Sequence, residues 1–396
     1  MPGALEGIVV LEAAQIMAGP FCGLLLADMG ADVIKVERPG AGDDTRRMGP
    51  TFVAGESPAF LAMNRNKRGI ALNLKAEGGR EVFRRLAARA DVLIENYRPG
   101  TLEGLGLGYD ELRPLNPRLI YCSISAFGQT GPYRERGGFD LVAQGMSGLM
   151  SVTGEPGRPP VKVGVPITDL NAGMYGAYGI LCAVIHRMTS GQGQRVDTSL
   201  LEGGIAYTFW ESAQYWSTGE VPGPLGSAHR LSAPYQALRT KDGYVNIGGA
   251  NQATWEALCA ALGRPDLAAD PRFKSQVDRR RHYLELAEIL EGMLSRESTA
   301  HWLDVFERAG VPAGPIYDLA QVYRDPHVLA RGMLAEVEHP TAGRIAQIGI
   351  PVKLSATPGR IARPAPGLGE HTDEVLRWAG YRPEEIAALR AEGAAA

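Results

Sequence analysis

The chain has 396 residues, of which 45% are hydrophobic and 21% are charged, and its formal net charge is −3 at pH 7. This mixture excludes a disordered or fibrous chain, and the slightly acidic balance argues against a general nucleic-acid-binding protein. A chain of this length predicts two domains rather than one.

The N-terminal third of the chain alternates short β-rich runs with helical stretches. Strands are expected at 7–13, 32–37, 91–96 and 119–125, and helices near 20–29 and 77–90. Apolar runs that are bounded by Gly and Pro and separated by helices predict βαβ units on a parallel sheet covered on both faces. The fold class is therefore α/β.

A long apolar run follows Asp169. The stretch from Gly173 to Ile185 is too short to span a bilayer and predicts a buried helix. Aspartate is preferred just before a helix, where its oxygen accepts a hydrogen bond from an unpaired backbone N–H. Helix capping is the simplest interpretation of Asp169, and the positive end of the helix dipole should keep its carboxylate ionised.

The composition changes around 219–234, where Gly, Pro and Ser predict a linker or functional loop. Next, Asp242-Gly243 between two β-rich runs predicts a hairpin. Helices are expected near 252–262, 279–295 and 299–309, and the three arginines at 279–281 are interpreted as a solvated helix face.

From about 330 to 362 the chain returns to short β segments, followed by helices within 371–380 and 383–393. His371 is expected to cap the first of these helices, and the final alanines are expected to fray. The predicted organisation is an N-terminal part of a large domain at 1–218, a linker and small domain at 219–329, and a return to the large domain at 330–396.

A parallel sheet of this class places its ligands outside the carboxyl ends of its strands, where residues 15–19, 37–40 and 96–100 should cluster. No GxGxxG follows the first strand. Basic residues accumulate over positions 38–68, which suits either a phosphorylated ligand or scattered surface charge. They are Arg38, Arg46, Arg47, Arg65, Lys67 and Arg68.

Several other sites are not expected. The histidines lack metal-type spacing, and no GxSxG of a hydrolase nucleophile is present. Four widely spaced cysteines without CxxC, and a start without a secretory signal, favour a reducing cytoplasmic compartment.

Seven motifs in order carry a family resemblance. They are AGP after the first strand, GADVIKVERPGAGDDTR, NRNKRGIALNLK, VLIENYRPG, LIYCSISAFGQTGPY, DLVAQGMSGLM and TDLNAGMYGAYG. With these motifs the chain closely resembles the family III CoA-transferases from about residue 5 to about residue 390. The resemblance implies a Rossmann-like large domain built from both chain ends, a smaller α+β domain from the middle, and two subunits interlocked as a homodimer.

The resemblance also implies the site. Asp169 matches the nucleophile, which carries coenzyme A (CoA) as an aspartyl thioester, so that one difficult exchange becomes successive acyl transfers. Asp140 matches an orienting or acid–base residue. CoA is then a substrate, and no permanently bound cofactor, metal, nucleic acid or membrane is expected. The positions matching CoA contacts are Ile16, Met17, Ala18, Arg38, Leu72, Asn73, Lys75, Asn96, Tyr97, Arg98 and the stretch 137–140.

Two positions depart from the family pattern. Gly104 stands where several relatives carry an arginine for the nucleotide, so another basic residue substitutes or CoA sits differently. Residues 226–232 replace the glycine-rich loop of formyl-CoA transferase, which argues against formate and oxalate as substrates.

The segments GAGDDTRRMGPTFV, ESPAFLAMNRNKR and GSAHRLSAPYQALRTKDGY most resemble family members that use dicarboxylates. We therefore expect transfer from succinyl-CoA or a similar donor to a C4–C5 dicarboxylate. Four basic residues in loops are candidates for binding its second carboxylate. They are Arg46, Arg47, His229 and Arg230.

Two alternatives remain at this stage. The racemase branch of the family uses a histidine next to an aspartate, but the matching pair here is Phe139-Asp140, and phenylalanine cannot exchange a proton. A non-catalytic CoA-binding protein is the other alternative, since a fold alone does not fix a function.

Overall fold

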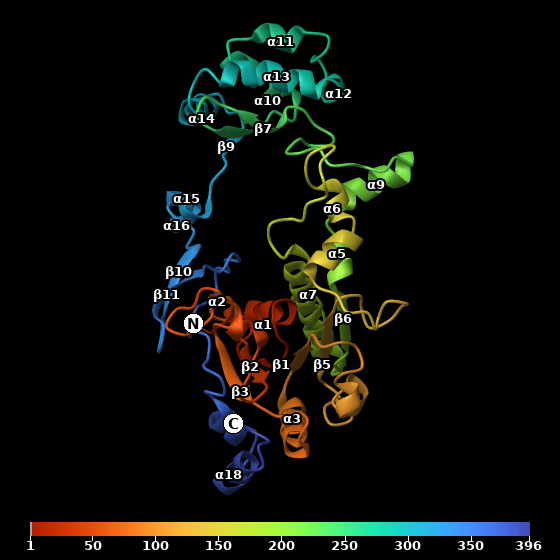
Figure 1. The fold of residues 1–396 in the computed structure, drawn as a ribbon, viewed down its shortest axis with the longest axis vertical. Coiled ribbons are helices and arrows are strands. Elements are labelled where there is room, and N and C mark those ends of the chain that lie inside the picture. Colours follow the sequence, from red (N-terminus) through yellow and green to blue (C-terminus); the bar gives the residue numbers. More distant parts are fainter. Residues whose placement is uncertain (1) are drawn as a thin grey trace. The chain divides into compact units, whose positions relative to one another are not determined.

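The computed structural model describes residues 2–396. The chain divides into two compact units, each described by itself (Figure 1). The first unit comprises the chain up to residue 150 with residues 162–219 and 326–396, and the second comprises 151–161 and 220–325. The first unit is thus built from both ends of the described chain. Residues 151–161, which the sequence placed with the N-terminal part, belong to the second unit, where the Gly226 N–H donates to the Gly154 carbonyl at 2.8 Å.

A six-stranded parallel sheet forms the centre of the first unit. In spatial order its strands are β3 (Lys67–Ala71), β2 (Asp32–Glu37), β1 (Val9–Ala13), β4 (Val92–Glu95), β5 (Ile120–Ser125) and β6 (Arg195–Ser199). The α/β prediction is confirmed. The strand order reverses between β1 and β4, and sheets of this kind bind ligands at the carboxyl ends of such a strand pair.

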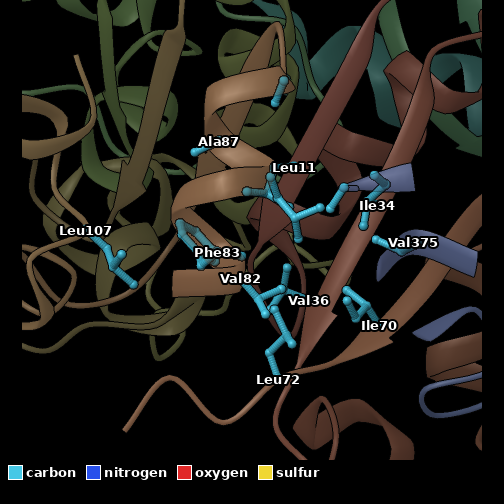
Figure 2. Close-up of a cluster of buried hydrophobic side chains, with 14 of the residues drawn as sticks. Leu11, Ile34, Val36, Ile70, Leu72, Val82, Phe83, Ala87, Leu107 and Val375 are labelled. Atoms are coloured by element: carbon cyan, nitrogen blue, oxygen red, sulfur yellow. The ribbon is translucent and has the colours of Figure 1, made fainter. Parts of the chain in front are cut away.

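Helices cover both faces of the sheet. One face packs against α1 (Ala18–Asp28) and α7 (Ile167–Ser190). The other face packs against α3 (Glu77–Arg89), α17 (Thr372–Trp378) and α18 (Pro383–Ala391), so the C-terminal helices complete a core begun at the N-terminus. Figure 2 shows this second core, in which Val375 of α17 lies beside Ile34 and Ile70 of the sheet.

The C-terminus is docked, so the expectation that it frays is wrong. Ala394 and Ala395 are buried, and the Ala396 N–H donates to the Ala71 carbonyl at 3.1 Å. The Thr372 hydroxyl of α17 donates to the Ala396 carbonyl, which ties the last residues to the edge of the sheet. The His371 side chain does not cap α17; its Nδ1 accepts the Gly69 N–H of β3 instead.

Helix α7 approaches α1 and the sheet closely because its inner face carries glycines. A Cβ on Gly173 would lie 2.6 Å from the Ala18 carbonyl oxygen of α1, and one on Gly176 would lie 2.9 Å from Ile124 Cδ1 of β5. At the far end of α7, the buried Arg187 pairs with Asp91 at 2.8 Å. Close packing therefore fixes the helix along its whole length.

The prediction that α7 is buried is only half right. Its outer face exposes large apolar side chains, among them Tyr178, Ile185 and Met188. The alternating Gly and large apolar residues give two different faces, so one face packs on the sheet while the other stays uncovered in the single chain. None of the helices in residues 2–396 has the length and apolar character needed to cross a membrane.

The remaining elements of the first unit surround this sheet. They are η1 (Asp44–Arg47), α2 (Pro58–Met63), η2 (Glu103–Leu105), α4 (Tyr109–Leu112), α5 (Asp140–Met146), α8 (Leu200–Ile205), α9 (Phe209–Thr218), α16 (Pro326–Ala330), and the antiparallel hairpin of β10 (Leu334–His339) and β11 (Gly343–Ile348). A further short helix, α6 (Leu149–Val152), spans the boundary between the units.

The second unit packs helices against a small antiparallel sheet. Its elements are β7 (Tyr235–Arg239), β8 (Tyr244–Gly248), β9 (Ala313–Pro315), α10 (Gln252–Ala261), α11 (Pro265–Ala269), α12 (Gln276–Arg281), α13 (Tyr283–Leu294), α14 (Thr299–Arg308) and α15 (Leu319–Val322). The predicted hairpin is present. The helix predicted at 279–295 is interrupted at His282, where α12 ends and α13 begins.

Arg279 contradicts the prediction of a solvated arginine face. Its side chain is fully buried and donates to the carbonyls of Ala233 and Phe273 and to Gln252 Oε1. A run of three like charges suggested a surface, but α12 turns its first arginine inward, where it holds three separate segments together.

We predict that Gly173→Ala lowers the free energy of unfolding by about 1–3 kcal/mol, because the added methyl group overpacks the α1–α7 contact. The matched control is Gly145→Ala in the exposed side of α5, where a Cβ would meet only Met150 Sδ at 3.8 Å. That change should stabilise by about 0.5–1 kcal/mol. Urea titrations of both variants measure the difference, and equal effects would contradict the packing argument.

Candidate active site

The loops after β1 and β4 are joined by their own hydrogen bonds. The Gln15 N–H donates to Asn96 Oδ1 at 2.9 Å, and the Asn96 amide donates back to the Gln15 carbonyl at 2.8 Å. Ile16, the next residue, has a left-handed backbone with φ of 68°, and its N–H donates to Asp43 Oδ1 at 3.1 Å. The loop at the switch point is therefore held in one conformation.

A buried network of four charges supports this loop. Lys35 Nζ lies 3.1 Å from Glu12 Oε1 and 2.9 Å from Asp43 Oδ2, and Lys67 Nζ lies 2.8 Å from Glu12 Oε2. Burial alone would lower the pKa of Lys35, but the facing carboxylates of Glu12 and Asp43 outweigh it and raise the pKa above its ordinary value. Burial lowers the pKa of Lys67 to about 8, although the carboxylate of Glu12 opposes this effect. The ion pairs hold the four side chains together beneath the loop.

Most of the basic residues at 38–68 have partners inside the protein. Arg46 makes two hydrogen bonds of 2.7 Å to the carboxylate of the buried Glu37, Arg65 pairs with Asp28, and Arg68 pairs with Asp32 and Glu374. Arg65, Lys67 and Arg68 also lie at the amino end of β3, away from the predicted ligand edge. Arg65, Lys67 and Arg68 thus fit neither a site for a phosphorylated ligand nor scattered surface charge, the two predicted interpretations of the basic residues.

Arg38 and Arg47 differ from this group. Their side chains are each 53% exposed, and both contact Asp44. Arg38 remains available at the carboxyl end of β2, where the sequence placed a CoA contact.

Two adjacent pockets lie along the carboxyl edge of the sheet. One of about 380 Å³ is lined by Arg38, Leu72, Asn73, Lys75 and Tyr97, among others. The other, of about 330 Å³, is lined by residues that include Ile16, Met17, Ala18, Asn96, Tyr97, Arg98 and Asp169. Because Tyr97 and Thr101 line both pockets, the positions between Ile16 and Arg98 that are expected to contact CoA gather on one surface with Asp169. Gly137, Gly138 and Phe139 lie in the same wall as Asp169.

Gly104 lies close to the first of these pockets, whose wall includes Leu102 and Leu105. A Cβ on Gly104 would have no neighbour within 4 Å. The structure therefore leaves open space where several relatives carry an arginine. Lys75 and Arg38 are the cations that line this pocket.

Asp169 does not cap its helix, contrary to the simplest sequence interpretation. Helix α7 begins at Ile167, so Asp169 is the third residue of its first turn. The capping carboxylate belongs to Asp140, whose Oδ1 accepts the Thr168 N–H at 3.0 Å and the Thr168 hydroxyl at 2.8 Å. Its other oxygen, Oδ2, accepts from Gln144 Nε2 at 2.7 Å. Asp140 is thus fixed by α5 and holds the start of α7.

The Asp169 carboxylate is left without a recorded hydrogen-bond donor among residues 2–396. Burial and then the nearby charge of Asp140 raise its pKa to about 7. Desolvation and the like charge of Asp140 therefore oppose the helix dipole, which was expected to keep this carboxylate ionised. An acid that titrates near neutral pH beside a pocket is a strong candidate for a reactive group.

His229 and Arg230 lie in the second unit. The His229 ring packs against Tyr235 with 4.9 Å between centroids, and its Nδ1 accepts the Leu231 N–H. Arg230 donates to the Gly223 carbonyl, and its own carbonyl accepts from Arg280 of α12. Helix α12 therefore holds this loop in place within its unit.

The sheet order, the paired switch-point loops and the pocket lined by Asp169 define an α/β protein with a candidate ligand site at the carboxyl ends of its strands. The model of CoA-transferase family III matches residues 5–372. The chain belongs to this family and is a CoA-transferase, which confirms the resemblance of its motifs.

Named relatives agree with this assignment. Succinyl-CoA:glutarate CoA-transferase of Homo sapiens is 42% identical over 373 residues, which cover 94% of this chain and 85% of that protein. Succinate–glutarate CoA-transferase of Agrobacterium fabrum is 43% identical and covers 94% of each chain. The crystal structure of a CAIB/BAIF family protein from Brucella suis superposes with a TM-score of 0.85 at 39% identity, covering 96% of this chain and 100% of that one.

We predict that Asp169→Asn stabilises the protein at alkaline pH. The folded pKa of Asp169, about 7, lies above the ordinary value of 3.8, so the ionised wild-type residue destabilises the fold increasingly between these two pH values. The neutral asparagine lacks this cost. The gain in melting temperature over wild type should therefore be small near pH 4, larger at pH 8 and constant above it. Melting curves across this range test the prediction, and a gain that is independent of pH would contradict it.

Proposed function

We propose that the enzyme transfers CoA from succinyl-CoA or a similar donor to a C4–C5 dicarboxylate, with Asp169 as the nucleophile. The observation that carries this proposal is a half-buried carboxylate without a hydrogen-bond donor, at the end of the pocket where the expected CoA contacts gather. The names of the two relatives, both acting between succinate and glutarate, support the choice of substrates.

The proposed reaction is a series of acyl transfers between CoA, Asp169 and the two acids. An Asp169 oxygen attacks the thioester carbon of the donor, and the CoA thiolate leaves, which gives a mixed anhydride. The thiolate then attacks Cγ of Asp169 and expels the donor acid, so that CoA is held as a thioester. The acceptor carboxylate attacks the same carbon and expels the thiolate, which finally attacks the acceptor carbonyl and releases Asp169 as a carboxylate.

Asp140 acts in this scheme as a positioning residue. Its two oxygens are engaged by Thr168 and Gln144, which suits a role in holding the first turn of α7 rather than in moving a substrate proton. Phe139, the preceding residue, lines the Asp169 pocket with a ring that carries no titratable group. Phe139 and Asp140 therefore do not favour the racemase alternative, which needs a second proton-transfer residue.

We also propose that the enzyme is a homodimer. The first unit exposes large apolar side chains on α7 and α9, and such side chains often lie in interfaces. The most exposed of them are Tyr178, Ile185, Met188, Phe209, Trp210 and Trp216. A second copy of the chain is the occupant that fits, because the family resemblance implies interlocked subunits.

We predict that Asp169→Asn binds CoA but loses acyl exchange between succinyl-CoA and glutarate by about a thousandfold or more, because the covalent nucleophile is gone. Calorimetry measures CoA binding, and chromatography of the two thioesters measures exchange. Near-normal exchange by a freshly purified variant that has not deamidated would refute the assignment of Asp169.

We predict a mass near twice 42.4 kDa in light scattering, and no folded monomer on dilution alone, because interlocked chains separate only when they open. The variant Ile185→Glu on the exposed face of α7 should weaken assembly if that face is buried between subunits. A stable and active monomer of the wild-type chain would contradict the dimer.

A further inference from the structure

Two arginines line the pocket that contains Asp169, and neither pairs with an acid. Arg98 and Arg136 are both part of its wall, and Asp169 is the one acidic residue in that wall. Among residues 2–396, no side chain forms an ion pair with either guanidinium. Asp169 forms no ion pair with either of them in the described chain, and burial and the charge of Asp140 raise its pKa.

Arg136 is held by stacking instead of by a salt bridge. Its guanidinium carbon lies 3.9 Å from the centroid of the Tyr133 ring, and that ring packs edge-on against Phe127. Stacking engages the face of a guanidinium and leaves the in-plane N–H donors free for a carboxylate. Arg136 is thus an oriented cation whose donors have no acceptor within the described chain.

Arg98 lies beside it. A Cβ on Gly137 would come within 3.1 Å of Arg98 Nη2, so the bare backbone at Gly137 gives this side chain its room. Arg98 follows Asn96 and Tyr97 in the loop after β4, where CoA is expected to run. Arg136 itself is not among the positions expected to contact CoA, although it directly precedes the stretch 137–140, which is among them.

The charge of the pocket changes during the proposed reaction. With Asp169 ionised, the wall carries two positive charges and one negative charge. When Asp169 is converted into a neutral thioester, two positive charges remain without an anion. A dicarboxylate brings two negative charges at this step, whereas a monocarboxylate leaves one of these two exposed cations paired only with water.

We propose that Arg136 is a specificity-determining residue that binds the second carboxylate of the acyl acceptor. This inference rests on the proposed CoA transfer to a dicarboxylate and names the residue that selects it. The CoA phosphates have separate cations, since Arg38 and Lys75 line the neighbouring pocket. Arg46 and Arg47, two of the residues considered from sequence, have acidic partners and do not line the Asp169 pocket.

The test compares Arg136→Gln with Arg134→Gln, a matched exposed arginine two positions away that does not line the pocket. Acyl exchange is measured at varied glutarate and at varied butyrate, which has one carboxylate. We expect kcat/KM for glutarate to fall about tenfold to a hundredfold in Arg136→Gln and that for butyrate to stay within about twofold. Arg136→Lys should be intermediate, because it keeps the charge without the planar fork.

Two further measurements separate the possible causes. The dissociation constant of CoA, measured by calorimetry, should not change in Arg136→Gln. With CoA bound, glutarate should bind more weakly to Arg136→Gln than to the wild-type protein. Calorimetry measures this binding, so the role of Arg136 is tested even if the protein has no acyl exchange. The inference is overturned if glutarate and butyrate lose activity equally, if CoA binding weakens to the same extent, or if Arg136→Gln behaves like Arg134→Gln. A different result is that the wild-type protein shows no acyl exchange and still binds glutarate more tightly than Arg136→Gln does. That result would refute the proposed function alone.

Discussion

Two carboxylates lie beside the first turn of α7, and it is Asp140 that accepts hydrogen bonds from Thr168 in this turn. Its oxygens accept from the Thr168 N–H, the Thr168 hydroxyl and the Gln144 amide. Asp169 is left close to a like charge, half-buried and without a recorded donor in residues 2–396, and its pKa rises to about 7. A carboxylate that has lost water and gained no hydrogen bond keeps its lone pairs available, which is the state a nucleophile needs.

This arrangement depends on how closely α7 can approach the rest of the sheet. Gly173 and Gly176 allow backbone contact with α1 and β5, and Arg187 anchors the distant end of the helix to Asp91. The buried ion pairs of Glu12, Lys35, Asp43 and Lys67 hold the loop at Ile16, whose N–H binds Asp43. Two closely packed segments therefore border the pocket that Asp169 lines.

Sequence patterns predicted the parts of the fold that obey simple periodicity. The apolar strand at 32–37 is found as β2, Asp32–Glu37, and the Asp-Gly turn closes the hairpin of β7 and β8. Strands β3 and β6 were not predicted, because β3 carries Lys67 and Arg68 and β6 carries Arg195 and Asp197, and their charges hide the β pattern. The same limit applies to Arg279, since a buried cation satisfied by carbonyls has no local sequence signature.

The candidate site was likewise predicted only in part from the sequence. Family motifs identified Asp169 and the CoA positions, and the structure gathers those positions around adjacent pockets. The sequence assigned the cap of α7 to Asp169 rather than to Asp140, because the deciding hydrogen bonds join residues 28 positions apart. Arg136 was missed because its distinguishing property is the lack of an acidic partner, which only three-dimensional contacts reveal.

The most direct test of the central claim is peptide mass spectrometry of the enzyme after incubation with succinyl-CoA. Our account predicts CoA bound covalently as a thioester on Asp169. Rapid acyl exchange with no adduct, or with an adduct on another residue, would contradict it.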